Sequence, residues 1–140
     1  MKISIVGLGY VGLSLSLLMA QSNDVIAYDI DKKKVEKIKS KISPFSDEYI
    51  EDYLKNKSSN LQATTNKKTD YFDSDFIVIA TPTDYDAVKN TFDTSSIEIV
   101  IKDILNNKKN DPTIIIKSTV PLGFTSEARK KFNYSQIYFS

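Results

Sequence analysis

The chain has 140 residues, with 19 basic and 18 acidic side chains and no cysteine, histidine or tryptophan. This length predicts one domain, 1–140, that holds a core without disulfides or zinc, because a chain of this size buries roughly two-thirds of its unfolded surface. The net charge of +1 predicts no binding to nucleic acid or to an anionic membrane, and cysteine nucleophiles and histidine bases are excluded. No apolar run is long enough to span a bilayer and no signal peptide is evident, so we expect a cytoplasmic protein.

Six short apolar runs alternate with helical or polar stretches along the chain. The predicted strands are Ile3 to Val6, Val25 to Tyr28, Leu61 to Thr64, Phe76 to Ala80, Thr113 to Lys117 and Gln136 to Phe139. Strands that alternate with helices predict an α/β fold, here a doubly wound Rossmann-type six-stranded parallel sheet with the strand order 3-2-1-4-5-6.

The predicted helices are Tyr10 to Gln21, Asp31 to Lys41, a helix containing Tyr49 to Leu54 that Ser46 or Asp47 caps, Ser95 to Asn106, and a last helix that Thr125 caps and that runs through Phe132. The first helix carries apolar residues all round and is predicted to be buried. The second has only a narrow apolar stripe, which is typical of a surface helix.

The first predicted strand runs directly into Gly7-Leu8-Gly9-Tyr10-Val11-Gly12, and a helix is predicted to follow. In a dinucleotide-binding fingerprint the first glycine permits a tight turn, the second lets the backbone approach a pyrophosphate, and the third lets the helix pack against the sheet. Gly7, Gly9 and Gly12 match these roles. The amides of Tyr10 and Val11 are expected to face a diphosphate at the positive end of the helix. The alternative is a glycine turn shaped only for packing.

Asp29 stands at the end of the second predicted strand, 17 residues after Gly12. This is close to the spacing of about 20 residues at which an acidic side chain binds the adenosine ribose. A carboxylate there repels a 2′-phosphate, so the sequence predicts NAD rather than NADP. Asp31 is predicted to cap the next helix, and Lys32, Lys33 and Lys34 are typical of a solvated helix start.

Two loops follow predicted strands at their carboxyl ends, where ligands bind in open α/β sheets. They are Thr81-Pro82-Thr83 and Ser118-Thr119-Val120-Pro121-Leu122-Gly123. Their hydroxyls suit a ribose or a nicotinamide amide, although helix capping or turn formation explains each loop equally well. The acidic residues Asp84, Asp86 and Asp93 lack the spacing of a calcium loop, so a solvated loop and no metal site are predicted.

Together, the glycine turn, the Tyr28-Asp29 strand end and the two hydroxyl-bearing loops resemble the amino-terminal domain of the UDP-glucose/GDP-mannose dehydrogenase family along the whole chain. Members of that family oxidise the C6 alcohol of a nucleotide sugar to a carboxylate and use two NAD per turnover. The resemblance implies NAD contacts at the pyrophosphate from Tyr10 and Val11, at the adenosine ribose from Asp29 and Lys34, and on the nicotinamide side from Thr83 and Thr119.

The sequence departs from the family pattern at Phe124, where threonine is frequent, and in the glycine-poor loop from Asp84 to Phe92. The chain ends just before the position of the family's Pro-Glu-Phe-x-x-Glu segment, and the family's catalytic cysteine, lysine and asparagine lie in a later domain. We therefore expect the chain to bind NAD without turnover, and we name no catalytic residue in it. By the same resemblance, the full-length protein is expected to bind UDP-glucose or a related nucleotide sugar and to be a homodimer. Two alternatives stay open: a stand-alone NAD-sensing regulatory module and the NAD-binding domain of another dehydrogenase.

Overall fold

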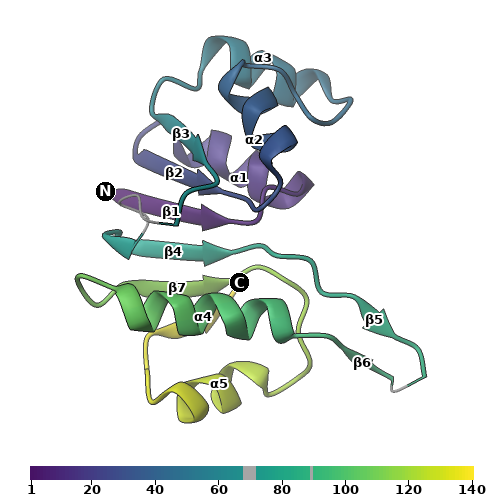
Figure 1. The fold of residues 1–140 in the computed structure, drawn as a ribbon, viewed down its shortest axis with the longest axis vertical. Helices are drawn as coiled ribbons and strands as arrows, with labels where there is room; N and C mark the ends of the chain where they lie inside the picture. Colours follow the sequence, from purple (N-terminus) through teal and green to yellow (C-terminus); the bar gives the residue numbers. More distant parts are fainter. Residues whose placement is uncertain (68–71, 89) are drawn as a thin grey trace.

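A computed structural model of the chain describes residues 1–67, 72–88 and 90–140. Within these ranges the main sheet contains β1 (Lys2–Val6), β2 (Asp24–Tyr28), β3 (Leu61–Thr64), β4 (Phe76–Ile79), β7 (Thr113–Ile116) and β8 (Ile137–Phe139). All neighbouring strands are parallel, in the order β3-β2-β1-β4-β7-β8 (Figure 1). The six predicted strands and their predicted order are therefore confirmed.

Two layers of helices cover the sheet. They are α1 (Tyr10–Met19), α2 (Lys32–Lys39), α3 (Glu48–Asn56), α4 (Ser95–Asn107) and α5 (Phe124–Phe132). Neighbouring residues of a strand point to opposite faces. In β4, Ile77 and Ile79 belong to the core cluster that contains α4 and α5, whereas Val78 packs on the α1 side. The apolar positions of α1, α2 and α3 form a core on that second face.

The outer side of α1 differs from the prediction of a buried helix. Tyr10, Val11 and Leu18 are 55%, 53% and 58% exposed, and the helix ends at Met19 rather than Gln21. Positions 10, 14 and 18 lie one above the other on a helix, so they share a face. That face points away from the sheet, because only one side of α1 contacts the strands. Apolar composition alone had suggested burial on every side.

The start of α5 also differs from the prediction that Thr125 caps it. Gly123 precedes the helix with φ of 85°, and no side chain caps it. This left-handed conformation favours glycine and turns the chain so that Phe124, the first helical residue, is buried in the core. Thr125 lies inside the first turn instead.

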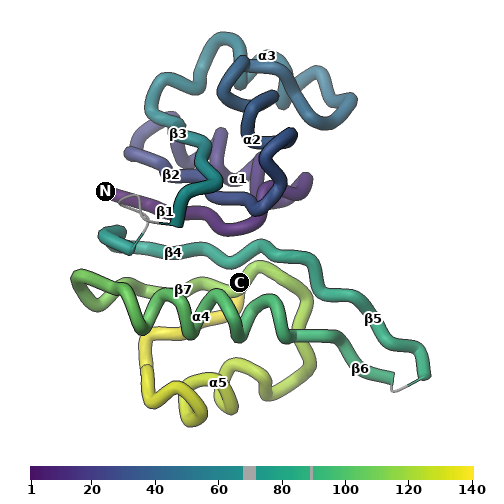
Figure 2. Tube along the Cα trace, viewed as in Figure 1, coloured from purple at the N-terminus to yellow at the C-terminus, as the bar shows by residue number. Residues whose placement is uncertain are grey.

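The segment predicted as a solvated acidic loop contains a short hairpin of β5 (Tyr85–Asp86) and β6 (Thr91–Phe92). The rings of Tyr85 and Phe92 pack with centroids 5.2 Å apart. The chain runs from β4 out to this hairpin and returns to α4 (Figure 2). Among the described residues, no group of three or more potential metal-binding side chains is placed to hold an ion. Likewise, no helix in the described ranges has the length and apolar character needed to cross a membrane.

The carboxyl ends of β1, β2 and β4 lie next to one another at one edge of the sheet. Val6, the last residue of β1, pairs with Tyr28 on one side and with Ile79 on the other. The strand order reverses direction between β1 and β4, and open α/β sheets bind ligands at such a point. Residues that follow these strands, including Gly7 and Asp29, are thus brought to the edge where a ligand is expected.

Candidate functional site

The glycine turn after β1 is built by close backbone packing. Gly7 has φ of 93°, and a Cβ atom on it would lie 2.5 Å from the carbonyl oxygen of Ala80. A Cβ atom on Gly12 would lie 1.8 Å from the carbonyl oxygen of Gly7. Side chains are therefore excluded at both positions by the backbone that surrounds them, as the fingerprint predicts for its first and third glycines.

Gly9 stands in a different environment. A Cβ atom on it would meet nothing within 4 Å, so the fold itself does not require glycine at this position. Gly9 is the residue before α1 and carries no side chain to cap the helix, and the first amides of a helix have no acceptor within it. The open space beside Gly9 and the amides of Tyr10 and Val11 together form a surface suited to an anion.

The side chain of Tyr10 is directed toward the segment before α3. Its hydroxyl donates a hydrogen bond of 2.5 Å to Oδ2 of Asp47, and its ring packs edge-on against Phe45 with centroids 5.9 Å apart. The hydrogen bond raises the pKa of Tyr10 and lowers the pKa of Asp47. Oδ1 of Asp47 also accepts from the amide of Ile50, so Asp47 rather than Ser46 caps α3. This contact joins the start of α1 to the start of α3.

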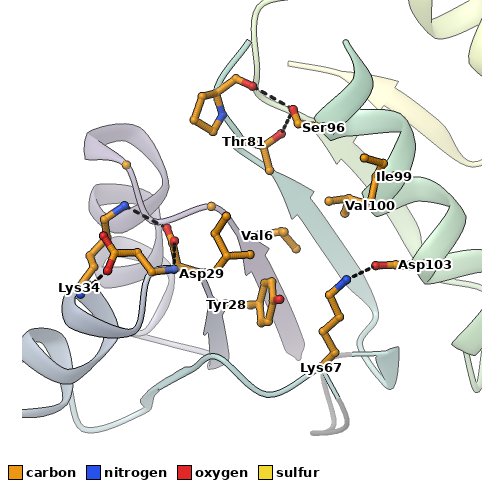
Figure 3. Close-up of a pocket in the computed structure, with 15 residues that line it drawn as sticks. Val6, Tyr28, Asp29, Lys34, Lys67, Thr81, Ser96, Ile99, Val100 and Asp103 are labelled. Atoms are coloured by element: carbon orange, nitrogen blue, oxygen red, sulfur yellow. Dashed lines mark hydrogen bonds and ion pairs between the residues drawn. The ribbon is translucent and has the colours of Figure 1, made fainter. Parts of the chain in front are cut away.

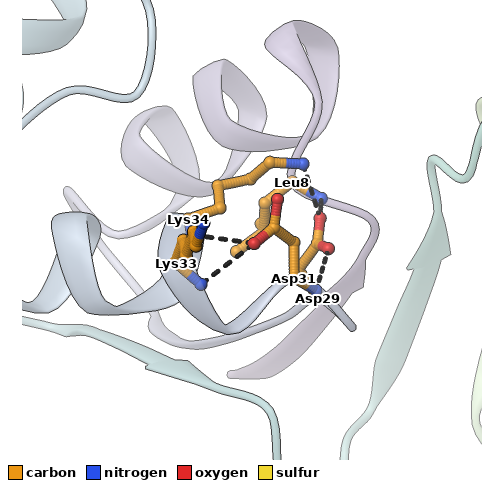
Figure 4. Close-up of polar contacts among 5 residues, drawn as sticks. All are labelled: Leu8, Asp29, Asp31, Lys33 and Lys34. Carbon is orange, nitrogen blue, oxygen red and sulfur yellow. Dashed lines mark hydrogen bonds and ion pairs between the residues drawn. The ribbon is translucent and has the colours of Figure 1, made fainter.

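Asp29, just after β2, lies at the centre of a hydrogen-bond network and is 7% exposed. Its Oδ2 accepts from the amide of Leu8 at 2.7 Å and from Nζ of Lys34 at 3.1 Å, and its Oδ1 accepts from the amide of Asp31 at 2.8 Å (Figure 4). A carboxylate offers about four acceptor positions, so roughly one remains for a ligand. Asp29 therefore fastens the glycine turn to the start of α2, a structural role that its spacing alone did not reveal.

Asp31 and Lys34 complete this network. Oδ1 of Asp31 accepts from the amides of Lys33 at 2.9 Å and Lys34 at 3.2 Å, which confirms Asp31 as the cap of α2 (Figure 4). Lys34 is not a simple solvated lysine, because its side chain is 23% exposed and forms an ion pair with Asp29. The positive charge of Lys34 offsets the negative charge of Asp29 beside the glycine turn.

A crevice of about 470 Å³ opens at the carboxyl edge of the sheet, between the β1–β2 ends and α4 (Figure 3). Its lining residues are Val6, Gly7, Gly9, Tyr28, Asp29, Ile30, Asp31, Lys34, Lys67, Thr81, Pro82, Ser96, Ile99, Val100 and Asp103. Of the predicted site residues, the fold brings Gly7, Gly9, Asp29 and Lys34 together here. Tyr10, Val11 and Gly12 continue from Gly9 into α1 but do not line the crevice.

The two predicted threonines lie outside this crevice. Thr83 is half-buried after β4, and Thr119 is exposed after β7. Both loops do meet at the same edge of the sheet, because the buried Ser118 hydroxyl donates to the carbonyl oxygen of Thr81 at 2.6 Å. Ser96, at the start of α4, also fixes this region through its hydrogen bond of 2.9 Å to the carbonyl oxygen of Pro82.

Sequence reasoning missed the wall of the crevice that α4 supplies. Ser96, Ile99, Val100 and Asp103 recur at the spacing of one helix face. They stand beside the core stripe of Ile97, Ile101 and Ile104, which packs on the sheet. Ile99 and Val100, two apolar residues outside the core stripe, are a signal that was available in the sequence. Ile30, which is 84% exposed, follows Asp29 directly and lines the crevice from the side of β2.

The comparisons with known proteins agree with this fold. Residues 1–136 match the model of the "UDP-glucose/GDP-mannose dehydrogenase family, NAD binding domain". The whole chain is 51% identical to part of a UDP-glucose 6-dehydrogenase of Campylobacter jejuni and 50% identical to part of one of Streptococcus pneumoniae. It covers 36% of the first protein and 35% of the second. A solved UDP-D-ManNAc dehydrogenase from Pyrococcus horikoshii superposes with a TM-score of 0.86 at 26% identity, over 99% of this chain and 35% of that one. The chain thus spans about a third of the length of these relatives.

Proposed function

The chain belongs to the UDP-glucose/GDP-mannose dehydrogenase family as its NAD-binding domain, and we propose that it holds NAD for an enzyme that oxidises the C6 alcohol of a nucleotide sugar. The observation that carries the proposal is the open space at Gly9, beside uncapped amides of α1 and at the mouth of the crevice. A glycine turn shaped only for packing has no need of glycine at that position.

In this proposal each part of NAD meets a different part of the site. The pyrophosphate lies against Gly9 and the amides of Tyr10 and Val11, and the adenosine ribose binds the remaining acceptor position of Asp29. Lys34 stays paired with Asp29. The resemblance to the family assigns the nicotinamide side to Thr83 and Thr119, beyond the crevice on the same edge of the sheet. The bound cofactor supplies a hydride acceptor, and the residues of this chain bind and orient it.

The substrate proposed for the whole enzyme is UDP-glucose, because the most similar relatives named above are UDP-glucose 6-dehydrogenases. A related nucleotide sugar is the alternative, since the family also includes enzymes that act on other sugars. The homodimer and the location in the cytoplasm stay predictions.

We predict that the chain binds NAD at least ten-fold more tightly than NADP. Asp29 repels a 2′-phosphate, and the single arginine, Arg129, donates to the carbonyl oxygen of Ile137 and does not line the crevice. We expect NAD affinity in the range of tens of micromolar or weaker, about −6 kcal/mol. Isothermal titration calorimetry with both dinucleotides tests this prediction.

Asp29→Asn, compared with a control variant, tests whether Asp29 sets the preference for NAD over NADP. The amide cannot accept from all three present donors, and the charge of Lys34 becomes available to a 2′-phosphate. We expect NAD to bind about five-fold to ten-fold more weakly and the preference over NADP to shrink. Asp24→Asn, at the exposed opposite end of β2, is expected to leave both affinities unchanged. Equal or tighter binding of NADP by the unmodified chain contradicts the role given to Asp29.

We predict that the purified chain of 140 residues produces no NADH from UDP-glucose. The two-step oxidation of the family uses a cysteine thiol to hold the aldehyde, and this chain has neither cysteine nor histidine. The rate of NADH formation is measured by absorbance at the NADH wavelength, at high concentrations of the chain, NAD and UDP-glucose. Turnover above the buffer blank contradicts the proposal that catalytic groups lie elsewhere in the protein, and Lys117, Asp84 and Tyr85 are then the residues to substitute.

A further inference from the structure

One end of the crevice is bridged by an ion pair between Lys67 and Asp103 (Figure 3). Lys67 follows β3 and Asp103 lies in α4, so the pair joins the two sides of the crevice. The distance from Nζ to Oδ2 is 2.5 Å, and the two side chains are 51% and 33% exposed. Ion pairs this accessible contribute little to stability. Both residues line the crevice, so a ligand that fills this end of it would contact the pair.

The other charged groups of the crevice are already engaged around the glycine turn. Asp29 and Lys34 bond to each other, and Asp31 caps α2. Asp103 differs, because Oδ2 accepts from Lys67 while Oδ1 has no hydrogen-bond partner among the residues that the structure describes. An ionised carboxylate only accepts hydrogen bonds. A ligand that uses Oδ1 must therefore bring a donor.

An apolar surface adjoins this acceptor. Ile99 and Val100 lie one helical turn before Asp103 on the same face of α4, and Ile99 is 58% exposed. Ile30 lines the crevice from the side of β2. A flat aromatic ring that covers these side chains buries apolar surface and brings its edge to Asp103. Because Asp29 is proposed to bind the adenosine ribose, the ring next to it is adenine, whose edge carries an amino group.

We propose that Asp103 accepts a hydrogen bond from the 6-amino group of adenine, and that Lys67 is a positioning residue that holds this carboxylate in place. The assignment rests on the proposed binding of NAD and makes Asp103 a determinant of base specificity. The hydrogen bond to Asp103 raises the pKa of Lys67 above its ordinary value. A purine that carries a 6-oxo group instead places a carbonyl oxygen against the carboxylate and is disfavoured.

The test compares NAD with nicotinamide hypoxanthine dinucleotide, whose base has a 6-oxo group in place of the amine and a hydrogen atom on N1. We expect the unmodified chain to bind NAD about ten-fold more tightly by calorimetric titration. In Asp103→Asn, the side-chain amide can donate to the 6-oxo group, so this preference is expected to fall below two-fold or to reverse. Glu98→Gln is the matched control, because Glu98 also lies in α4, is 34% exposed and pairs with Lys131, yet does not line the crevice.

Lys67 is tested in the same assay. Lys67→Met is expected to reduce the preference for NAD about three-fold, and Lys67→Arg to restore most of it. Equal binding of both dinucleotides by the unmodified chain overturns the assignment, as does a preference in Asp103→Asn that matches Glu98→Gln. If neither dinucleotide binds, the proposed cofactor role itself is wrong and this assignment is lost with it.

Discussion

Gly9→Val is expected to abolish measurable NAD binding while the chain keeps its native fold. A Cβ atom at this position meets no protein atom within 4 Å, and the backbone of Gly9, with φ of −66° and ψ of −174°, is open to any residue. The new side chain therefore fills space that the fold leaves empty and that the proposed pyrophosphate needs. We expect affinity to fall at least 100-fold, with a far-ultraviolet circular dichroism spectrum that matches the unmodified chain.

Two further variants test whether Gly9→Val acts by filling the space next to Gly9 that the proposed pyrophosphate needs. Gly9→Ala adds a smaller group and is expected to give an intermediate loss of affinity. Ser14→Val adds bulk five residues further along the chain, within α1 and outside the crevice, and is expected to leave NAD binding unchanged. Normal binding by Gly9→Val shows instead that the fingerprint is only a packing turn, and the proposed function then loses its main support.

The sheet was predictable because its strands are short, most of them are rich in β-branched or aromatic residues, and helical or polar stretches separate them. Ile77 to Ile79 and Ile114 to Ile116 are continuously apolar, as strands buried on both faces must be, and both form interior strands of the sheet. The small hairpin was not predictable in the same way. Each of its strands has two residues, too few to show a period. Its pairing depends on contacts such as the tilted packing of the Tyr85 and Phe92 rings.

The site was predictable only where local sequence fixes the geometry. The glycine turn and the cap at Asp31 each involve residues within a few positions of one another. The contacts of Asp29 with Leu8 and of Lys67 with Asp103 join residues 21 and 36 positions apart, so they arise only when the strands pair and α4 packs. For this reason the sequence indicated the glycine turn and Asp29 but not the end of the crevice at Lys67 and Asp103.

Gly12→Ala is expected to unfold or strongly destabilise the chain, the opposite outcome to Gly9→Val. A Cβ atom on Gly12 lies 1.8 Å from the carbonyl oxygen of Gly7, which is backbone held by the hydrogen bond of 2.8 Å from the Gly7 amide to the carbonyl oxygen of Tyr28. Helix propensity alone predicts the reverse sign, because alanine is favoured over glycine by about 1 kcal/mol within a helix. Steric overlap of this depth is expected to cost about 3 kcal/mol or more.

Thermal unfolding followed by circular dichroism measures the effect of Gly12→Ala, and a fall in Tm of about 10 °C or more is expected for a domain of this size. Gly123→Ala is the control for conformational strain without a clash, because Gly123 has φ of 85° and a Cβ atom there meets nothing within 4 Å. That variant is expected to lose only about 1 to 2 kcal/mol. From the most to the least stable, the expected order is thus Gly9→Ala, Gly123→Ala and Gly12→Ala. A Gly12→Ala chain that melts at the same temperature as Gly9→Ala means that α1 does not approach the turn this closely, and the geometry of the anion site must then be wrong as well.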